Sequence, residues 1–138
     1  MLFKQIVGET VLAVTNSTAA GRTVRVYAFC ARTSGPLAYP AGSIAIVAIN
    51  VNNASMSFDV NVAGATVGLR EEYHLTAPGG NMGSLSIELN GQVLELGAGG
   101  TLPAFVPVEV EDGASAIEMS ALSYGFIVLK SANAAACL

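Results

Sequence analysis

The stretch that decides the fold is residues 43–52, SIAIVAINVN, a mostly apolar run rich in Ile and Val. Its unbroken apolar part, residues 44–49, has the length of a strand and is far shorter than the ~20 residues of a membrane-spanning helix. Because both faces of such a strand are apolar, we expect it at the centre of a sheet that is covered on both sides. No transmembrane segment is expected elsewhere.

Shorter apolar segments bounded by turn signals surround this run. Residues Leu85, Ile87 and Leu89 alternate with polar ones, which predicts a strand with one buried and one solvated face. Asn90-Gly91 then predicts a hairpin, because a type I′ turn needs positive φ at two successive positions. The pattern as a whole predicts an all-β fold, an antiparallel β-sandwich of about eight or nine strands after a short helical turn. The helical turn is expected at 2–7 with Gly8 as its stop, and the strands at 9–15, 22–32, 43–52, 55–62, 67–77, 84–90, 92–97, 104–110 and 122–130.

The composition indicates one domain that another body covers. The chain has 138 residues, of which 52% are hydrophobic and 12% are charged, against roughly 25% charged in an average domain. A sandwich so poor in charge exposes apolar surface, and large apolar patches mark interfaces. Six basic residues against ten acidic ones exclude a nucleic-acid surface, which needs clustered Lys and Arg.

The ionisable residues offer no catalytic pair. Glycoside hydrolysis uses two carboxyl groups, but the adjacent Glu71 and Glu72 leave a strand by opposite faces. Glu109 and Glu111 share a face of a predicted edge strand, with nothing apolar nearby to raise the pKa of one of them. The lone histidine, His74, has no nucleophile motif beside it. We therefore expect no catalytic, metal or cofactor site in this chain.

Two further patterns are interpreted as structural. Tyr27 and Phe29 share one face of a predicted strand, and Tyr124 and Phe126 share one face of another. Exposed aromatic faces can bind sugars, but we interpret these pairs as core or inter-domain packing. Residues 97–100, GAGG, are followed by a strand where a phosphate loop needs a helix, so they predict a turn.

The two cysteines and two N-x-S/T motifs bear on the cellular compartment. Cys30 and Cys137 have only one histidine to join them, so a four-ligand zinc site is not expected; a disulfide and two free buried thiols remain equally favoured by the residues alone. Asn16 and Asn53 begin the N-x-S/T motifs, and both fall at predicted turns, where a glycosylation acceptor would be exposed. Chance occurrence is the alternative, since Asn and Ser are ordinary turn residues.

Three groups of motifs resemble the heparanase family of glycoside hydrolases, and together they span essentially the whole chain. The EYHLT run at 72–76 is more similar to plant-type members than to vertebrate ones. The first group is LFK at 2–4, VG at 7–8 and VL at 11–12. The second group is RVY at 25–27, before Cys30, with AIN at 48–50. The third group is LNG at 89–91, TLP at 101–103, LSY at 122–124 and AACL at 135–138.

The resemblance implies a larger protein with a catalytic (β/α)8 barrel. Residues 1–8 would be the tail of the last barrel helix or a linker, and residues 9–138 the C-terminal sandwich. The family's two catalytic glutamates lie in the barrel and match nothing here, so this chain alone is expected to be non-catalytic. It would pack against and stabilise a barrel that hydrolyses β-glucuronosyl linkages in a polysaccharide or proteoglycan, and it would take in a strand from near the mature N-terminus.

The resemblance also implies a disulfide between Cys30 and Cys137, because the family pairs the matching positions. Asn53 matches a position that carries a glycosylation motif in related sequences. Both imply an oxidising compartment, that is, a secreted, extracellular, lysosomal or vacuolar protein. Two other functions stay open: a stand-alone carbohydrate-binding module, which the absence of Trp disfavours, and a structural sandwich that self-associates through an open edge strand.

Overall fold

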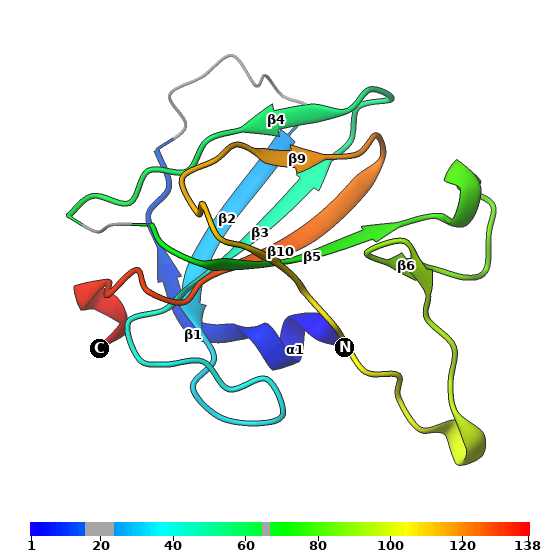
Figure 1. The fold of residues 1–138 in the computed structure, drawn as a ribbon, viewed down its shortest axis with the longest axis horizontal. Helices are drawn as coiled ribbons and strands as arrows, with labels where there is room; N and C mark the ends of the chain where they lie inside the picture. The colour runs from blue at the N-terminus through cyan, green and yellow to red at the C-terminus, as the bar shows by residue number, and fades with distance from the viewer. Residues whose placement is uncertain (16–23, 65–66) are drawn as a thin grey trace.

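The computed structural model describes residues 1–15, 24–64 and 67–138, and in that part of the chain the fold is almost entirely antiparallel β (Figure 1). One α-helix, α1, opens the described residues. The helix and strands are α1 (Leu2–Ile6), β1 (Val7–Leu12), β2 (Val24–Ala31), β3 (Ile44–Asn50), β4 (Met56–Phe58), β5 (Arg70–Thr76), β6 (Glu88–Leu89), β7 (Gln92–Val93), β8 (Val108–Val110), β9 (Ile117–Met119) and β10 (Ser123–Leu129), with short 3-10 turns η2 (Pro78–Gly80), η3 (Ala98–Gly100) and η4 (Ala135–Cys137).

The main sheet has the strand order β1-β2-β3-β10-β5-β6-β7, and β8 also pairs with β5. Strand β3 lies between its two longest partners: Ile44 is opposite Cys30 of β2 on one side and opposite Leu129 of β10 on the other. All but one of its residues are buried. The central position predicted for the apolar run at 43–52 is confirmed, because only a covered sheet can bury both faces of such a strand.

A second sheet, β4 paired with β9, covers one face of the main sheet, which makes the fold a β-sandwich (Figure 1). We call this face the closed face. Ile117 and Met119 of β9 are completely buried there against Ile46, Ile127 and Leu129. The burial of this apolar surface between two sheets is the main force that holds the layers together.

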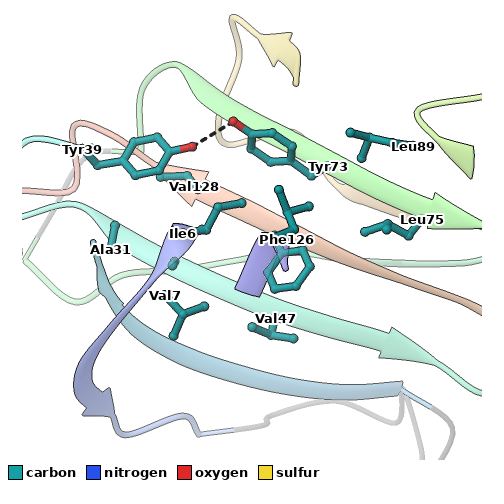
Figure 2. Packing of buried hydrophobic residues seen from close by; sticks show 12 residues of the cluster. Ile6, Val7, Ala31, Tyr39, Val47, Tyr73, Leu75, Leu89, Phe126 and Val128 are labelled. Carbon is teal, nitrogen blue, oxygen red and sulfur yellow. Dashed lines mark hydrogen bonds between the residues drawn. The ribbon is translucent and has the colours of Figure 1, made fainter. Parts of the chain in front are cut away.

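The opposite face of the main sheet, here called the open face, carries α1 and the long segment 77–107. Leu2 and Ile6 of α1 are buried against the sheet, together with Val47, Tyr73 and Phe126 (Figure 2). No sheet lies on this side among the described residues. The open face is therefore covered by one short helix and a loop instead of a full layer.

The hairpin predicted at Asn90-Gly91 is confirmed. Leu89 of β6 pairs with Gln92 of β7, and φ is 50° at Asn90 and 78° at Gly91. The Asn90 side chain also accepts a hydrogen bond from the His74 amide and donates to the carbonyl oxygens of Glu72 and Val106. One turn residue thus ties β5 to the hairpin and to the segment that leads into β8.

Several predicted boundaries are wrong. Of the strand expected at 84–90, only Glu88–Leu89 forms, and Leu85 is fully exposed instead of buried. Strand β9 was not predicted, because its three residues carry too short a pattern to be recognised. The helix ends at Ile6 and passes directly into β1, so Gly8 is no helix stop: a Cβ at this position would lie 2.7 Å from the carbonyl oxygen of Cys30.

Candidate functional site

Strand β5 places its polar side chains alternately on the two faces of the main sheet. Arg70, Glu72 and His74 lie on the closed face, and Glu71 lies on the open face with Tyr73. Glu71 and Glu72 therefore leave the strand by opposite faces, as the alternation of a strand requires. They cannot flank one glycosidic bond.

Arg70 is the centre of the network on the closed face, where it is 2% exposed. Its Nε donates to Glu72 Oε1 at 2.6 Å, and its Nη atoms donate to the carbonyl oxygens of Gly113, Ser115 and Ala116. His74 Nε2 lies 2.6 Å from the other carboxylate oxygen of Glu72. Four of the five guanidinium N–H donors are used, three of them on the turn that precedes β9, so this network has a structural role.

The surroundings of Glu72 favour the ionised form of its carboxylate. Burial alone would raise its pKa, but the hydrogen bonds with His74 and Arg70 outweigh burial and hold the pKa below its usual range. A catalytic acid of a glycosidase needs the opposite, a raised pKa. Glu72 is a counter-ion.

A second network lies on the open face and joins two tyrosines to Glu71. The carboxylate accepts hydrogen bonds from the hydroxyl groups of Tyr39 and Tyr73. It also forms an ion pair with Lys130, whose Nζ lies 2.7 Å away. The two tyrosine hydroxyl groups lie 2.9 Å from each other (Figure 2). Burial raises the pKa of Tyr73 to about 12. Burial also acts to raise the pKa of Glu71, but the hydrogen bond from Lys130 and the other contacts outweigh it, so the pKa of Glu71 is lowered. Burial also raises the pKa of Tyr39, so the shifts favour neutral tyrosines beside an ionised Glu71.

The two carboxylates predicted on an edge strand are exposed to solvent. Glu109 on β8 is exposed, with Lys130 Nζ at 3.5 Å, and Glu111 is exposed just beyond the strand. Among the described residues, no group of three or more His, Cys, Asp or Glu side chains is placed to hold a metal ion.

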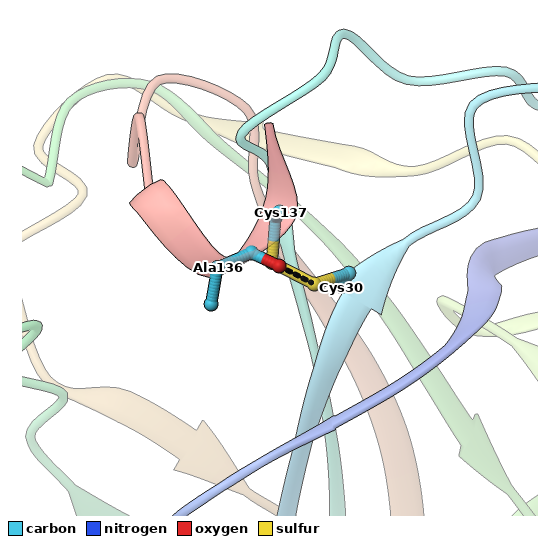
Figure 3. Close-up of a disulfide and its surroundings, with 3 residues drawn as sticks. All are labelled: Cys30, Ala136 and Cys137. Carbon is cyan, nitrogen blue, oxygen red and sulfur yellow. Dashed lines mark hydrogen bonds between the residues drawn. A yellow bond between two sulfur atoms is a disulfide. The ribbon is translucent and has the colours of Figure 1, made fainter.

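Cys30 and Cys137 are joined by a disulfide that connects the end of β2 to η4 (Figure 3). The dashed contact in Figure 3 joins Cys30 Sγ to the Ala136 carbonyl oxygen at 3.4 Å; because a disulfide sulfur carries no proton, we regard it as a van der Waals contact. In the chain-entropy description, closing the loop between these two cysteines stabilises the fold by about 4–5 kcal/mol. The bond holds the C-terminus against the closed-face cluster.

Of the two predicted glycosylation sites, Asn53 is exposed on the bend between β3 and β4, which leaves it accessible. Asn16 lies outside the described residues.

No described helix is long and apolar enough to cross a membrane.

The prominent surface feature is an apolar groove of about 680 Å³ on the open face. Aromatic side chains from three elements form its floor: Phe3 of α1 stands edge-on to Phe29 and Phe126, with ring centroids 6.0 and 6.3 Å apart, and Tyr124 stands edge-on to Phe126. Tyr27 is the fifth aromatic residue along the floor. The segment 94–105 forms the opposite wall with Leu94, Leu96, Leu102, Pro103 and Phe105.

All four residues of the two predicted aromatic pairs line the groove, but they differ in how far they are exposed. Phe126 is core, at 4% exposure, whereas Tyr27 and Tyr124 remain 50% and 39% exposed. Apart from the two tyrosine hydroxyls, Glu95 is the only polar side chain among the described residues that line the groove. The lining of the groove is therefore predominantly apolar.

The fold is shared with part of a glycoside hydrolase of known structure. The family 30 subfamily 8 xylanase Xyn30A of Clostridium acetobutylicum matches 91% of this chain with a TM-score of 0.50 and 18% sequence identity. The match covers 25% of the xylanase chain, so the matched sandwich is one part of a larger enzyme. The likeness shows the fold of this chain, a β-sandwich that forms one part of the xylanase.

Relatives found by sequence show the family to which the chain belongs. No protein-family model matches the chain. Heparanase of Bos taurus is 32% identical over 140 residues, covering 100% of this chain and 25% of heparanase, and baicalin-β-D-glucuronidase of Scutellaria baicalensis is 31% identical, covering 94% and 23%. The chain is a domain of the heparanase family, and it spans about a quarter of the length of these curated relatives.

Proposed function

We propose that this chain is the non-catalytic C-terminal sandwich of a heparanase-like glycosidase, and that it packs against and stabilises a catalytic (β/α)8 barrel of the same protein. Residues 9–138 form the sandwich, and residues 1–8 are the tail of the last barrel helix or a linker. The barrel hydrolyses β-glucuronosyl linkages in a polysaccharide or proteoglycan. The observation that carries the proposal is the end-to-end match to one quarter of enzymes named heparanase and glucuronidase.

The state of the carboxylates supports a non-catalytic role. Glu71 and Glu72 are both held ionised by fixed partners, on opposite faces of a strand. Retaining glycosidases need two carboxyl groups about 5–5.5 Å apart that face one bond. The chemistry of the longer protein therefore belongs to residues outside this chain.

The disulfide and the exposed Asn53 support an oxidising compartment, so we place the protein among secreted, extracellular, lysosomal or vacuolar proteins. Expression in a secretory host tests this assignment. Treatment with an N-glycosidase should shift the mass of the secreted protein, and Asn53→Gln should reduce that shift by the mass of one glycan.

The activity is tested by expressing the barrel region and this chain separately and together. We expect β-glucuronidase activity, measured with a chromogenic β-glucuronide, in the mixture or the joined protein and none in this chain alone. A barrel that is equally soluble and active without the chain would contradict the stabilising role. Hydrolysis by this chain alone would contradict the non-catalytic one.

A further inference from the structure

The hairpin turn at Asn90-Gly91 carries a chemistry that the fold restrains. Asn90 is the only asparagine of the chain that is followed by glycine. In an Asn-Gly pair the backbone nitrogen of the glycine can attack the side-chain carbonyl carbon of the asparagine, and no Cβ shields that nitrogen. This pair is therefore the position at which a side-chain amide of the chain is most prone to lose ammonia.

The structure holds both ends of the Asn90 side-chain amide. Its Oδ1 accepts a hydrogen bond from the His74 amide at 2.8 Å. Its Nδ2 donates to the carbonyl oxygens of Glu72 and Val106, at 3.1 and 2.9 Å, so both of its N–H donors are used. Attack by the Gly91 nitrogen would turn this planar amide tetrahedral and move its atoms out of all three contacts.

The backbone around Asn90 is attached to β5 as well. The Asn90 amide donates to the His74 carbonyl oxygen at 2.8 Å, and Leu89, which is 3% exposed, pairs with Leu75. The side chain of Asn90 is freed only when the β6–β7 hairpin separates from β5. Local openings of this kind have a free-energy cost of their own, so the folded chain keeps the amide out of reach of the reaction.

We propose that Asn90 is a deamidation site that the fold protects, and that its conversion makes the opening of the hairpin irreversible. The Gly91 nitrogen gives up its proton and bonds to Asn90 Cγ, the Cγ–Nδ2 bond breaks, and ammonia leaves with that proton. The product is a succinimide ring. Water then opens the ring, at Cγ to give aspartate or at the main-chain carbonyl carbon to give isoaspartate. One water is consumed for each ammonia released, and nothing is oxidised or reduced.

Neither product can restore the contacts of the closed hairpin. In aspartate a carboxylate oxygen takes the place of Nδ2 and faces the carbonyl oxygens of Glu72 and Val106, with no donor between them. Isoaspartate routes the backbone through Cβ and Cγ, which lengthens a turn whose φ angles are 50° at Asn90 and 78° at Gly91. In both cases the segment that leads to β8 loses its link to β5.

Ageing of the chain in two states tests the protection. The folded chain and the same chain in guanidinium chloride, with its disulfide intact, are kept at one mildly alkaline pH and one temperature. Mass spectrometry of the peptide that contains Asn90 follows the mass gain that replacing NH2 by OH produces. We expect conversion to be at least about tenfold slower in the folded chain than in denaturant. Gly91→Ala is the matched control in denaturant, where it should slow the conversion.

Two outcomes of that experiment overturn the proposal. Equal rates in the folded and the denatured chain would show that the fold gives no protection. Conversion in denaturant that is no faster at Asn90 than at Asn81, which is followed by methionine, would show that the turn is no special site.

Hydrogen exchange after refolding tests the irreversibility. When the aged chain is returned to buffer, molecules that keep Asn90 should regain slow exchange of the residue 90 amide, and converted molecules should exchange it at least about tenfold faster. Full protection in converted molecules would overturn the proposal, and this measurement needs no variant that folds.

A pair of variants gives the same comparison without ageing. Asn90→Asp should show the fast exchange of the residue 90 amide. Asn81→Asp adds the same charge at an exposed turn where the side chain only accepts a hydrogen bond, from the Gly83 amide, so it should exchange like the unaltered chain. Equal exchange in the two variants would overturn the role given to the Asn90 amide.

Discussion

The two faces of the main sheet are built from the same strands but are completed in different ways. On the closed face, β4 and β9 bury Ile117 and Met119 entirely, and Arg70 fixes the turn that leads into β9. On the open face, α1 and one loop leave a groove with half-exposed tyrosines. The difference teaches that the same strands can complete one apolar interface within the chain and leave the other partly exposed.

Removal of the disulfide should have the largest effect, because it frees the C-terminus from the closed face. Cys30→Ser/Cys137→Ser should lower the free energy of unfolding by about 4 kcal/mol, measured by urea denaturation under non-oxidising handling. The wild-type chain treated with a reductant is the control, and it should fall by a similar amount. A double variant as stable as the oxidised wild type would contradict the structural role of the bond.

Arg70→Ala should break the closed face almost as strongly. The substitution leaves Glu72 buried with one charged partner fewer and three carbonyl oxygens without their donor, and such losses cost about 3–5 kcal/mol. Arg25→Ala, on an exposed arginine of β2, is the matched control and should stay within about 0.5 kcal/mol. Equal unfolding midpoints for the two variants would show that the buried network contributes nothing.

A pair of Leu→Ala variants compares the two faces directly. Leu129 is 1% exposed in the closed-face cluster and Leu96 is 67% exposed at the groove. In this chain alone, Leu129→Ala should cost about 3 kcal/mol and Leu96→Ala less than about 0.5 kcal/mol. In the longer protein, the cost of Leu96→Ala should rise; an unchanged small cost there would mean that the groove stays open.

Acid should weaken the closed face with the smallest effect of this series. The pKa of Glu72 is lower in the folded chain than in the unfolded one, so the stabilisation is present above the unfolded value of about 4.3 and is lost as the pH falls through the folded pKa. Glu72→Gln should therefore flatten the dependence of the unfolding midpoint on pH below about 4.3. Glu118→Gln, at an exposed position of β9, is the matched control for the loss of one carboxylate.

The sequence alone determined the fold class, the central place of β3 and the hairpin at Asn90-Gly91. These features depend on local properties: side-chain alternation along a strand, a run of apolar residues, and the backbone angles that Asn and Gly tolerate. The resemblance to the heparanase family also came from the order and spacing of short motifs. Each signal lies within a few residues, where no knowledge of distant contacts is needed.

Only the tertiary structure decided which strand faces are buried and which distant residues pair with one another. Strand β9 exists because it pairs with β4, about sixty residues earlier in the chain, and Arg70 fixes the Ser115 carbonyl, 45 residues away. Leu85 has the alternation of a buried strand residue but is fully exposed to solvent, since no other described residue covers it. Burial and hydrogen bonding between distant residues depend on how the layers meet, and a pattern along one strand does not contain that information.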